Sequence, residues 1–110
     1  MTNVLLAGLP PVHPGAILRE DAIPALNTPI AAVARALGIS RQQLYDLLAE
    51  KRPVTAAMAI RLGKLLGNGP ALWLNMQSAY DLAVLSADMA DEVAGIPTLA
   101  VISGVRPLAA

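Results

Sequence analysis

The feature that most constrains this chain is a single glycine between two short amphipathic runs. Apolar residues recur at helical spacing before Gly38, and the spacing resumes in a new phase after it. Glycine readily takes the left-handed conformation that ends a helix, while Ile39 can return to the core and Ser40 is a favourable N-cap. The small Ala34, four residues before the glycine, lets a second helix cross the first closely. Residues 30–49 are therefore predicted to form a helix-turn-helix.

The second of these helices carries side chains suited to contact with DNA. If its leucines face inward, Arg and Gln side chains in its first turn face outward. Arg matches the acceptors of guanine and Gln bonds adenine through two atoms, and the first turn of such a helix reaches base edges in the major groove. A solvated surface helix is the alternative, but the glycine corner favours DNA. The predicted base-reading residues are Ser40, Arg41, Gln42, Gln43, Tyr45 and Asp46.

Charge is distributed unevenly, although the chain of 110 residues has a formal net charge of +0. Residues 28–66 hold the cations Arg35, Arg41, Lys51, Arg52, Arg61 and Lys64 against Asp46 and Glu50, a net charge of +4. Residues 1–27 sum to −1 and residues 67–110 to −3. Positive charge thus surrounds the predicted motif, as phosphate binding requires. The predicted contacts to the DNA backbone are Thr28, Arg35, Lys51, Arg52 and Thr55. For the basic loop that contains Lys51 and Arg52, the alternative is that these side chains are only solvated.

The remaining pattern predicts one all-α domain of five helices over residues 13–87, behind an N-terminal arm of residues 1–12. The first helix opens at His13 and Pro14, and Pro24 is expected to bend or end it. His13, the only histidine, is expected to be a cap or a surface residue. The further helices are expected from near Ile30 with Thr28 as N-cap, from Arg41, over 56–66 with Thr55 as N-cap, and from Pro70 to about residue 87.

The C-terminal tail, residues 88–110, is predicted to mediate dimerisation or partner binding. Residues 88–95 are acidic and are expected to form a turn, and residues 96–103 are β-branched, flanked by glycines and typical of a short strand. Such a strand needs a partner: its own copy, the run Val4–Leu9, or another protein's sheet edge. Trp73 is expected to close the monomer core. The predicted dimer or partner residues are Tyr80, Val84, Leu99 and Val101.

Several classes of protein are disfavoured by composition. The chain has no cysteine and one histidine, so neither a disulfide framework nor a thiolate metal site is expected, and no cofactor is predicted. No run reaches the roughly 18 apolar residues of a membrane span, and the N-terminus lacks the basic region of a signal peptide. A cytoplasmic protein without catalytic residues is expected, since acid–base or metal chemistry needs convergent groups.

From His13 to Tyr80 the chain resembles the HigA/VapI-type antitoxins of the XRE (Cro/repressor-like) helix-turn-helix family. The motifs that carry the resemblance are HPGAILRE at 13–20, ALGISRQQLYDLL at 36–48, KRPVTAAMAIRLGKLLG at 51–67 and LWLNMQSAYDL at 72–82. One departure is Ala16, where the family commonly has Glu. The resemblance implies a five-helix, lambda-repressor-like domain that binds a palindromic operator as a homodimer. It also implies an antitoxin that represses its own operon and neutralises a RelE/HigB-like ribonuclease toxin by binding it.

Two other classes of protein fit the same sequence pattern. One is a stand-alone phage- or plasmid-type transcriptional regulator of this fold, without a toxin partner. The other is a protein-interaction module that no longer binds DNA, because Asp46 and Glu50 near the predicted DNA-facing surface oppose phosphate. A neighbouring reading frame for a basic, RelE-like protein would separate the antitoxin from the stand-alone regulator.

Overall fold

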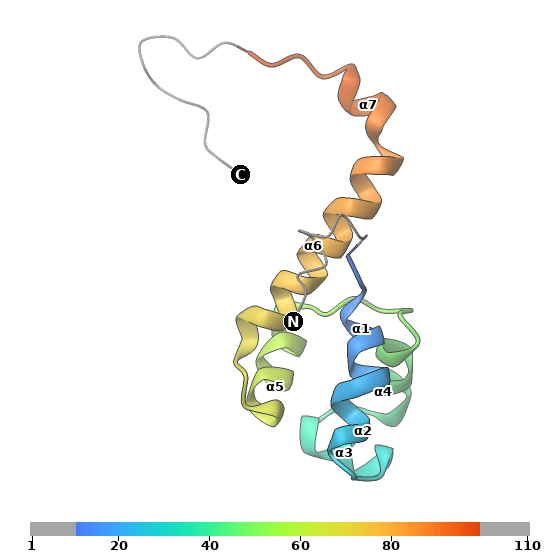
Figure 1. The fold of residues 1–110 in the computed structure, drawn as a ribbon, viewed down its shortest axis with the longest axis vertical. Helices are drawn as coiled ribbons and strands as arrows, with labels where there is room; N and C mark the ends of the chain where they lie inside the picture. The colour runs from blue at the N-terminus through green and yellow to red at the C-terminus, as the bar shows by residue number, and fades with distance from the viewer. Residues whose placement is uncertain (1–10, 100–110) are drawn as a thin grey trace.

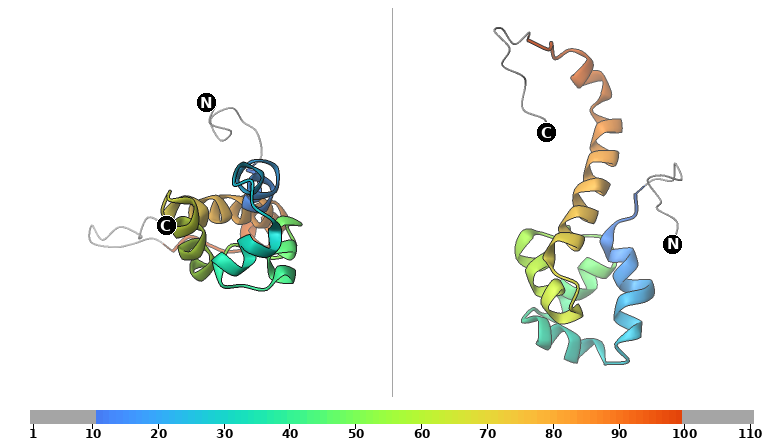
Figure 2. Two further views of the ribbon diagram at one scale, coloured as in Figure 1. Left: turned by 90° about the horizontal axis from the view of Figure 1, so that it is seen from below. Right: turned by 60° about the vertical axis from the view of Figure 1, so that its left-hand side comes forward.

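The computed structural model describes residues 11–99, and every regular element within that range is helical. Short helices form a body from which the long helix α6 rises, with the short α7 at its far end (Figure 1). Turned views show the same arrangement, with the N-terminal helical segment standing beside the base of α6 (Figure 2). The all-α prediction is confirmed, and none of the helices in residues 11–99 is long and apolar enough to cross a membrane.

The first helical segment is continuous but irregular. It consists of α1 (Pro14–Ile17), the π-helical turn η1 (Leu18–Ala22) and α2 (Ile23–Ala25). The N–H of Ile23 bonds to the carbonyl of Leu18, five residues back. Pro24 has no N–H, and its ring crowds the carbonyl four residues earlier, so a wider turn before it relieves the clash. The predicted disturbance at Pro24 is therefore a π turn ahead of the proline, and the helix ends at Ala25.

The helix-turn-helix and the helix after it follow the predicted bounds. They are α3 (Ile30–Leu37), α4 (Arg41–Leu48) and α5 (Ala56–Leu66). One predicted cap is wrong: the Thr28 hydroxyl donates to the carbonyl of Leu26 at 2.8 Å, and Pro29 occupies the N-cap position without a side-chain hydrogen bond. The tight turn after α2 directs the hydroxyl of Thr28 backwards, away from the start of α3.

The C-terminal half differs from the prediction in two respects. Helix α6 spans Pro70–Asp88, as expected, but the acidic segment expected to be a turn contains α7 (Ala90–Ala94). No glycine or proline interrupts residues 71–94, so nothing local prevents helix there. Residues 96–99 form no strand, and the remainder of the predicted strand, residues 100–103, lies outside the described residues.

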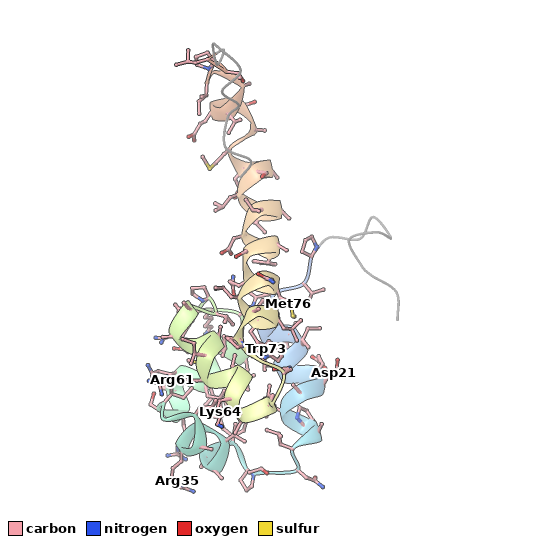
Figure 3. All side chains as sticks on the ribbon, turned by 90° about the vertical axis from the view of Figure 1, so that its left-hand side faces the viewer. Asp21, Arg35, Arg61, Lys64, Trp73 and Met76 are labelled. Carbon is pink, nitrogen blue, oxygen red and sulfur yellow. The ribbon has the colours of Figure 1, made fainter. Side chains whose placement is uncertain are left out.

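The core lies between the N-terminal segment, the helix-turn-helix, α5 and the base of α6. Leu18, Leu44, Leu47 and Leu62 are fully buried at its centre. Trp73 points from α6 into the body, is 2% exposed, and donates from Nε1 to Oδ1 of Asn68 at 2.8 Å (Figure 3). Trp73 therefore closes the monomer core, as the sequence predicts, and its indole N–H is satisfied.

Close backbone contact fixes how α6 leaves the body. Gly63 on α5 packs against the backbone of Gly69 and Pro70, and a Cβ at this position would collide with both. Buried Gln77 makes a second connection, because its Oε1 accepts from the N–H of Val54 at 2.8 Å. The loop between α4 and α5 is thereby anchored to α6, so the elements around the helix-turn-helix are held as one unit.

Candidate nucleic-acid interface

The corner between α3 and α4 has the geometry that the sequence predicts. Gly38 is left-handed, with φ 74° and ψ 31°, and the N–H of Ile39 bonds to the carbonyl of Ala34 at 3.0 Å. This hydrogen-bond pattern closes the end of α3 and turns the chain into α4. Ala34 is 2% exposed, so its small side chain sits in the packed crossing between the helices. The corner therefore fixes the direction of α4 relative to α3.

A reciprocal capping box holds the start of α4. The hydroxyl of Ser40 accepts from the N–H of Gln43 at 3.0 Å, and Oε1 of Gln43 accepts from the N–H of Ser40 at 2.9 Å. Both side chains were predicted to read bases. The structure places them in the cap, where each side chain accepts a backbone hydrogen bond that orients the first turn.

The outward face of α4 presents the other predicted base-reading residues. Arg41 and Gln42 are exposed, and Tyr45 is 51% exposed. Nε2 of Gln42 donates to Oδ1 of half-buried Asp46 at 2.8 Å. Arg41 forms no hydrogen bond or ion pair with any other described residue, so its guanidinium is available. The opposite face is buried through Leu44, Leu47 and Leu48, which directs the polar face outward.

Two arginines from outside the motif cap the carbonyl ends of its helices. Nη1 of Arg61, on α5, donates to the carbonyl of Leu37 at 2.8 Å, at the end of α3. Nη1 of Arg19, on η1, donates to the carbonyl of Leu48 at 2.7 Å, at the end of α4. A cation at a helix C-terminus also interacts favourably with the helix dipole. Sequence reasoning missed both roles, because each partner lies far along the chain and no local pattern marks it.

Arg19 also neutralises the carboxylate beside the basic loop. Its guanidinium pairs with Glu20 at 2.9 Å and with Glu50 at 3.1 Å. Hydrogen bonds to Glu20 and then Glu50 raise the pKa of Arg19 above its ordinary value. Glu50 takes a positive φ of 63° immediately before Lys51. Glu50, whose carboxylate is expected to repel phosphate, is therefore paired with Arg19 of the N-terminal segment.

The predicted backbone-contacting residues lie on three elements. Lys51 is exposed and Arg52 half-buried in the loop after α4, where they line a groove of about 320 Å³ with Pro53, Thr55 and Met58. The hydroxyl of Thr55 accepts from the N–H of Met58 at 3.2 Å, which confirms the predicted cap of α5. Arg35 is exposed on α3 and lies on the same side of the body as Arg61 and Lys64 (Figure 3). Thr28 is exposed, with its hydroxyl bonded to Leu26.

The predicted dimer residues lie apart from this surface. Tyr80 is half-buried, and its ring packs edge-on against His13 with centroids 5.0 Å apart. His13 is buried and its Nδ1 accepts from the N–H of Gly15, so the predicted capping role of this histidine is confirmed. Val84 is 42% exposed and Leu99 is 80% exposed. Val101 lies outside the described residues.

No group of three or more histidine or acidic side chains in residues 11–99 lies close enough together to hold a metal ion. The chemistry available on α4 and the following loop is instead that of hydrogen-bond donors and cations on a rigid convex face. Such a face suits base edges and phosphates.

Comparison with known proteins identifies the fold family. The model of the helix-turn-helix family HTH_3 matches residues 18–74, which contain both helices of the motif and the start of α6. The chain belongs to this helix-turn-helix family. Within this XRE-type family, the chain is 39% identical over 80 residues to virulence-associated protein I of Dichelobacter nodosus, covering 73% of this chain and 74% of the relative. The resemblance inferred from the sequence motifs is thus confirmed.

Two solved antitoxin structures have the same fold. The antitoxin GraA is 39% identical with a TM-score of 0.76, over 84% of this chain and 100% of GraA. The Pseudomonas aeruginosa antitoxin HigA, solved with the higBA promoter, is 37% identical with a TM-score of 0.74, over 82% of this chain and 99% of HigA. This helix-turn-helix chain is therefore similar to antitoxins over nearly their whole length.

Proposed function

We propose that this chain is the antitoxin of a type II toxin–antitoxin module. It binds the operator of its own operon as a repressor, and it neutralises a RelE/HigB-like ribonuclease toxin by binding it. The observation that carries the DNA-binding half is the exposed polar face of α4, where Arg41, which pairs with no residue in the described range 11–99, lies beside Gln42 and Tyr45. The toxin partnership is supported by the likeness to HigA and GraA, both antitoxins.

In this proposal the recognition helix α4 enters the major groove. Arg41 and Gln42 contact base edges, and Tyr45 and Asp46 lie behind them along the helix. Ser40 and Gln43 act through the capping box that aims the first turn. The side-chain amide of Gln42 donates to Asp46 in the free protein, and on DNA it can give up that hydrogen bond to bond an adenine.

Phosphates on either side of the groove meet the cations and helix ends around α4. Lys51 and Arg52 follow the recognition helix directly, and the free N–H groups at the start of α5 lie beside them. Arg35, on α3, and Thr28, just before α3, make the corresponding contacts to phosphates on the other side of the groove. These contacts set affinity and register, whereas α4 sets sequence preference.

The protein acts as a homodimer on a palindromic operator, through a surface that includes Tyr80, Val84, Leu99 and Val101. A two-fold axis places two recognition helices about 34 Å apart, one turn of DNA. In this proposal the protein works in the cytoplasm, without enzymatic activity and without a cofactor.

Fluorescence anisotropy with a labelled duplex from the protein's own promoter tests the DNA-binding half. We expect the promoter duplex to bind at least about 10³-fold more tightly than a scrambled duplex of equal length. Equal affinity for both duplexes would contradict sequence-specific repression.

The alternative is a stand-alone phage- or plasmid-type regulator of the same fold. The family likeness and the α4 surface suit it equally, but it has no toxin partner. The protein encoded by the adjacent reading frame distinguishes the two: an antitoxin forms a complex with it and suppresses its ribonuclease activity, whereas a stand-alone regulator does neither.

A further inference from the structure

Helix α4 ends in a left-handed turn that is normally made by glycine, yet a glutamate occupies it here. Glu50 has φ 63°, and its N–H bonds to the carbonyl of Leu47 at 3.0 Å. The N–H of Lys51 bonds to the carbonyl of Asp46 at 2.9 Å. These two bonds form a Schellman motif, in which a Cβ on the left-handed residue is disfavoured. A backbone held against its preference in this way points to a role for the side chain of Glu50.

The Glu50 side chain reaches across to the N-terminal helical segment. Its Oε2 accepts from Nη1 of Arg19 at 3.1 Å, and the same nitrogen donates to the carbonyl of Leu48 at 2.7 Å. No backbone N–H of residues 11–99 bonds to this carbonyl. Arg19 thus satisfies two groups at the end of α4: the carbonyl that the turn leaves open and the carboxylate that the turn carries.

Arg19 itself lies in an irregular stretch of backbone. It belongs to the π turn η1, and its Nε donates to Glu20, the next residue, at 2.9 Å, which leaves Nη1 for α4. Wide turns of this kind inside helices are frequent at functional sites. Two departures from regular backbone, the π turn at Arg19 and the left-handed Glu50, therefore meet in one ion pair.

The residue after Glu50 is the one whose charge this pair affects most. Lys51 is exposed and forms no ion pair with any residue in the range 11–99. An unpaired carboxylate on the preceding residue would attract its ammonium group and repel phosphate. The side chains of Arg19 and Glu50 are 42% and 34% exposed, and ion pairs this accessible contribute little to stability. The main consequence of the pair is therefore where it directs the carboxylate.

We infer that Arg19 is a positioning residue for DNA binding: by holding the carboxylate of Glu50, it keeps the ammonium group of Lys51 available to phosphate. The inference rests on the proposed function, in which the loop after α4 contacts the DNA backbone. Arg19 acts through Glu50 and needs no contact with DNA of its own. The competing explanation is that Arg19 supports α4 only through the carbonyl of Leu48.

A second arginine of the chain provides a matched control. Nη1 of Arg61 donates to the carbonyl of Leu37 at 2.8 Å, at the end of α3, and Arg61 pairs with no carboxylate in residues 11–99. Arg19→Met and Arg61→Met each remove one positive charge and one carbonyl cap, while an apolar stem of similar shape remains. Only Arg19→Met also releases a carboxylate beside Lys51. The difference between the two variants therefore isolates the pairing of Glu50.

The test is a double-mutant cycle in the full-length protein. Wild type, Arg19→Met and Arg61→Met are each prepared with and without Glu50→Gln, which removes the charge of Glu50 but keeps its size. Anisotropy titrations with the promoter duplex and a scrambled duplex, at several salt concentrations, measure affinity and its salt dependence. Urea denaturation establishes that each variant is folded at the temperature of the titrations.

We expect Arg19→Met to weaken binding to both duplexes by about tenfold at low salt, and the slope of log affinity against log salt to become shallower by about one. Adding Glu50→Gln should restore at least about fivefold. In wild type and with Arg61→Met, the same substitution should change affinity by less than about twofold. Arg19→Lys, which keeps a cation for Glu50, should bind at least about threefold more tightly than Arg19→Met.

If Glu50→Gln restores nothing to Arg19→Met, then Arg19 acts through the cap on Leu48 and the inference is overturned. The same effect of Glu50→Gln in all three backgrounds would overturn it as well, because Glu50 would then act independently of Arg19. Equal affinity of the wild-type protein for both duplexes would instead contradict sequence-specific repression, whereas the cycle on either duplex would still report how Arg19 acts.

Discussion

At the residue scale, the side chains around the α4 surface divide into those proposed to contact DNA and those that hold the helix. Arg41 and Gln42 are exposed on α4, whereas Ser40 and Gln43 bond to each other's backbone. Arg19 and Arg61, two of the chain's cations, donate to helix carbonyls, so part of each guanidinium is engaged within the fold. Counting charge in the sequence therefore overstates how many cations are free for phosphate.

Arg41→Ala and Gln42→Ala are each expected to weaken binding to the promoter duplex by about 1–3 kcal/mol, because each removes a base-edge contact. Binding to a scrambled duplex should barely change. Anisotropy titrations on both duplexes measure the difference, with Asn75→Ala, an exposed site on α6, as control. An equal loss on both duplexes would mean that these residues contact phosphate instead.

Lys51→Ala is expected to weaken all duplexes alike, because its ammonium group neutralises a phosphate. The slope of log affinity against log salt should become shallower by about one. Titrations at several salt concentrations measure that slope. A loss confined to the promoter duplex would assign Lys51 a base contact.

Sequence patterns predicted the residues that act locally and missed those that act across the fold. Gly38, Ser40 and Thr55 act within four residues of their own position, so composition and spacing identify them. Arg19 contacts a carbonyl 29 residues away, and Gln77 an N–H 23 residues away. Such pairings depend on how helices pack, which periodicity in one segment does not encode.

At the scale of elements, the helix-turn-helix depends on its corner and on the loop that follows it. The corner was predictable because only glycine readily adopts its conformation. The π turn before Pro24 and the helix α7 were not predicted. The π turn is a response to the missing N–H of Pro24. Helix α7 forms from residues that favour helices, and no capping residue marks its start.

Gly38→Ala is expected to lower the free energy of unfolding by about 1–2 kcal/mol, because a Cβ is disfavoured at φ 74°. Its Cβ would also approach Nη1 of Arg61, the group that caps α3. Gly38→Asn should cost less, since asparagine tolerates this conformation. Urea denaturation followed by circular dichroism measures both; equal loss from the two variants would indicate that sterics at Arg61 dominate.

Gln77→Ala is expected to destabilise the protein by about 1–3 kcal/mol, because the N–H of Val54 is left buried without an acceptor. The loop that carries Lys51 and Arg52 should then lose protection against hydrogen exchange. Ser78→Ala, one residue along on the exposed side, is the control. Unchanged stability of Gln77→Ala would mean that water replaces the amide.

At the scale of the whole molecule, the DNA-facing body and the projecting α6–α7 are separate surfaces on one short chain (Figure 1). The sequence assigned some apolar residues of α6 to the monomer core, such as Trp73, and others to a dimer or partner surface, such as Tyr80 and Val84. That α6 also carries apolar residues on its opposite side, such as exposed Leu82, became visible only once Trp73 and Gln77 fixed which side meets the body.

Val84→Asp is expected to convert the dimer into a monomer, because a carboxylate then lies on the proposed dimer face. A monomer cannot bind both half-sites of the operator at once, so its affinity for the promoter should fall by about 10²-fold or more. Light scattering and anisotropy measure the two effects. Leu82→Asp, on the opposite side of α6, is the control and should leave the mass unchanged. A Val84→Asp dimer would place the two-fold contact elsewhere.

The two arginine caps have a consequence for how this protein can change its target. Since Arg19 and Arg61 brace the motif from neighbouring helices, none of the bonds that set the angle of α4 involves Arg41 or Tyr45. Under the proposed function, substitutions at these exposed positions would change the operator that is bound, with the scaffold left untouched. The same bracing ties the motif to its surroundings: residues 30–49 grafted into another protein would leave behind the groups that keep them rigid.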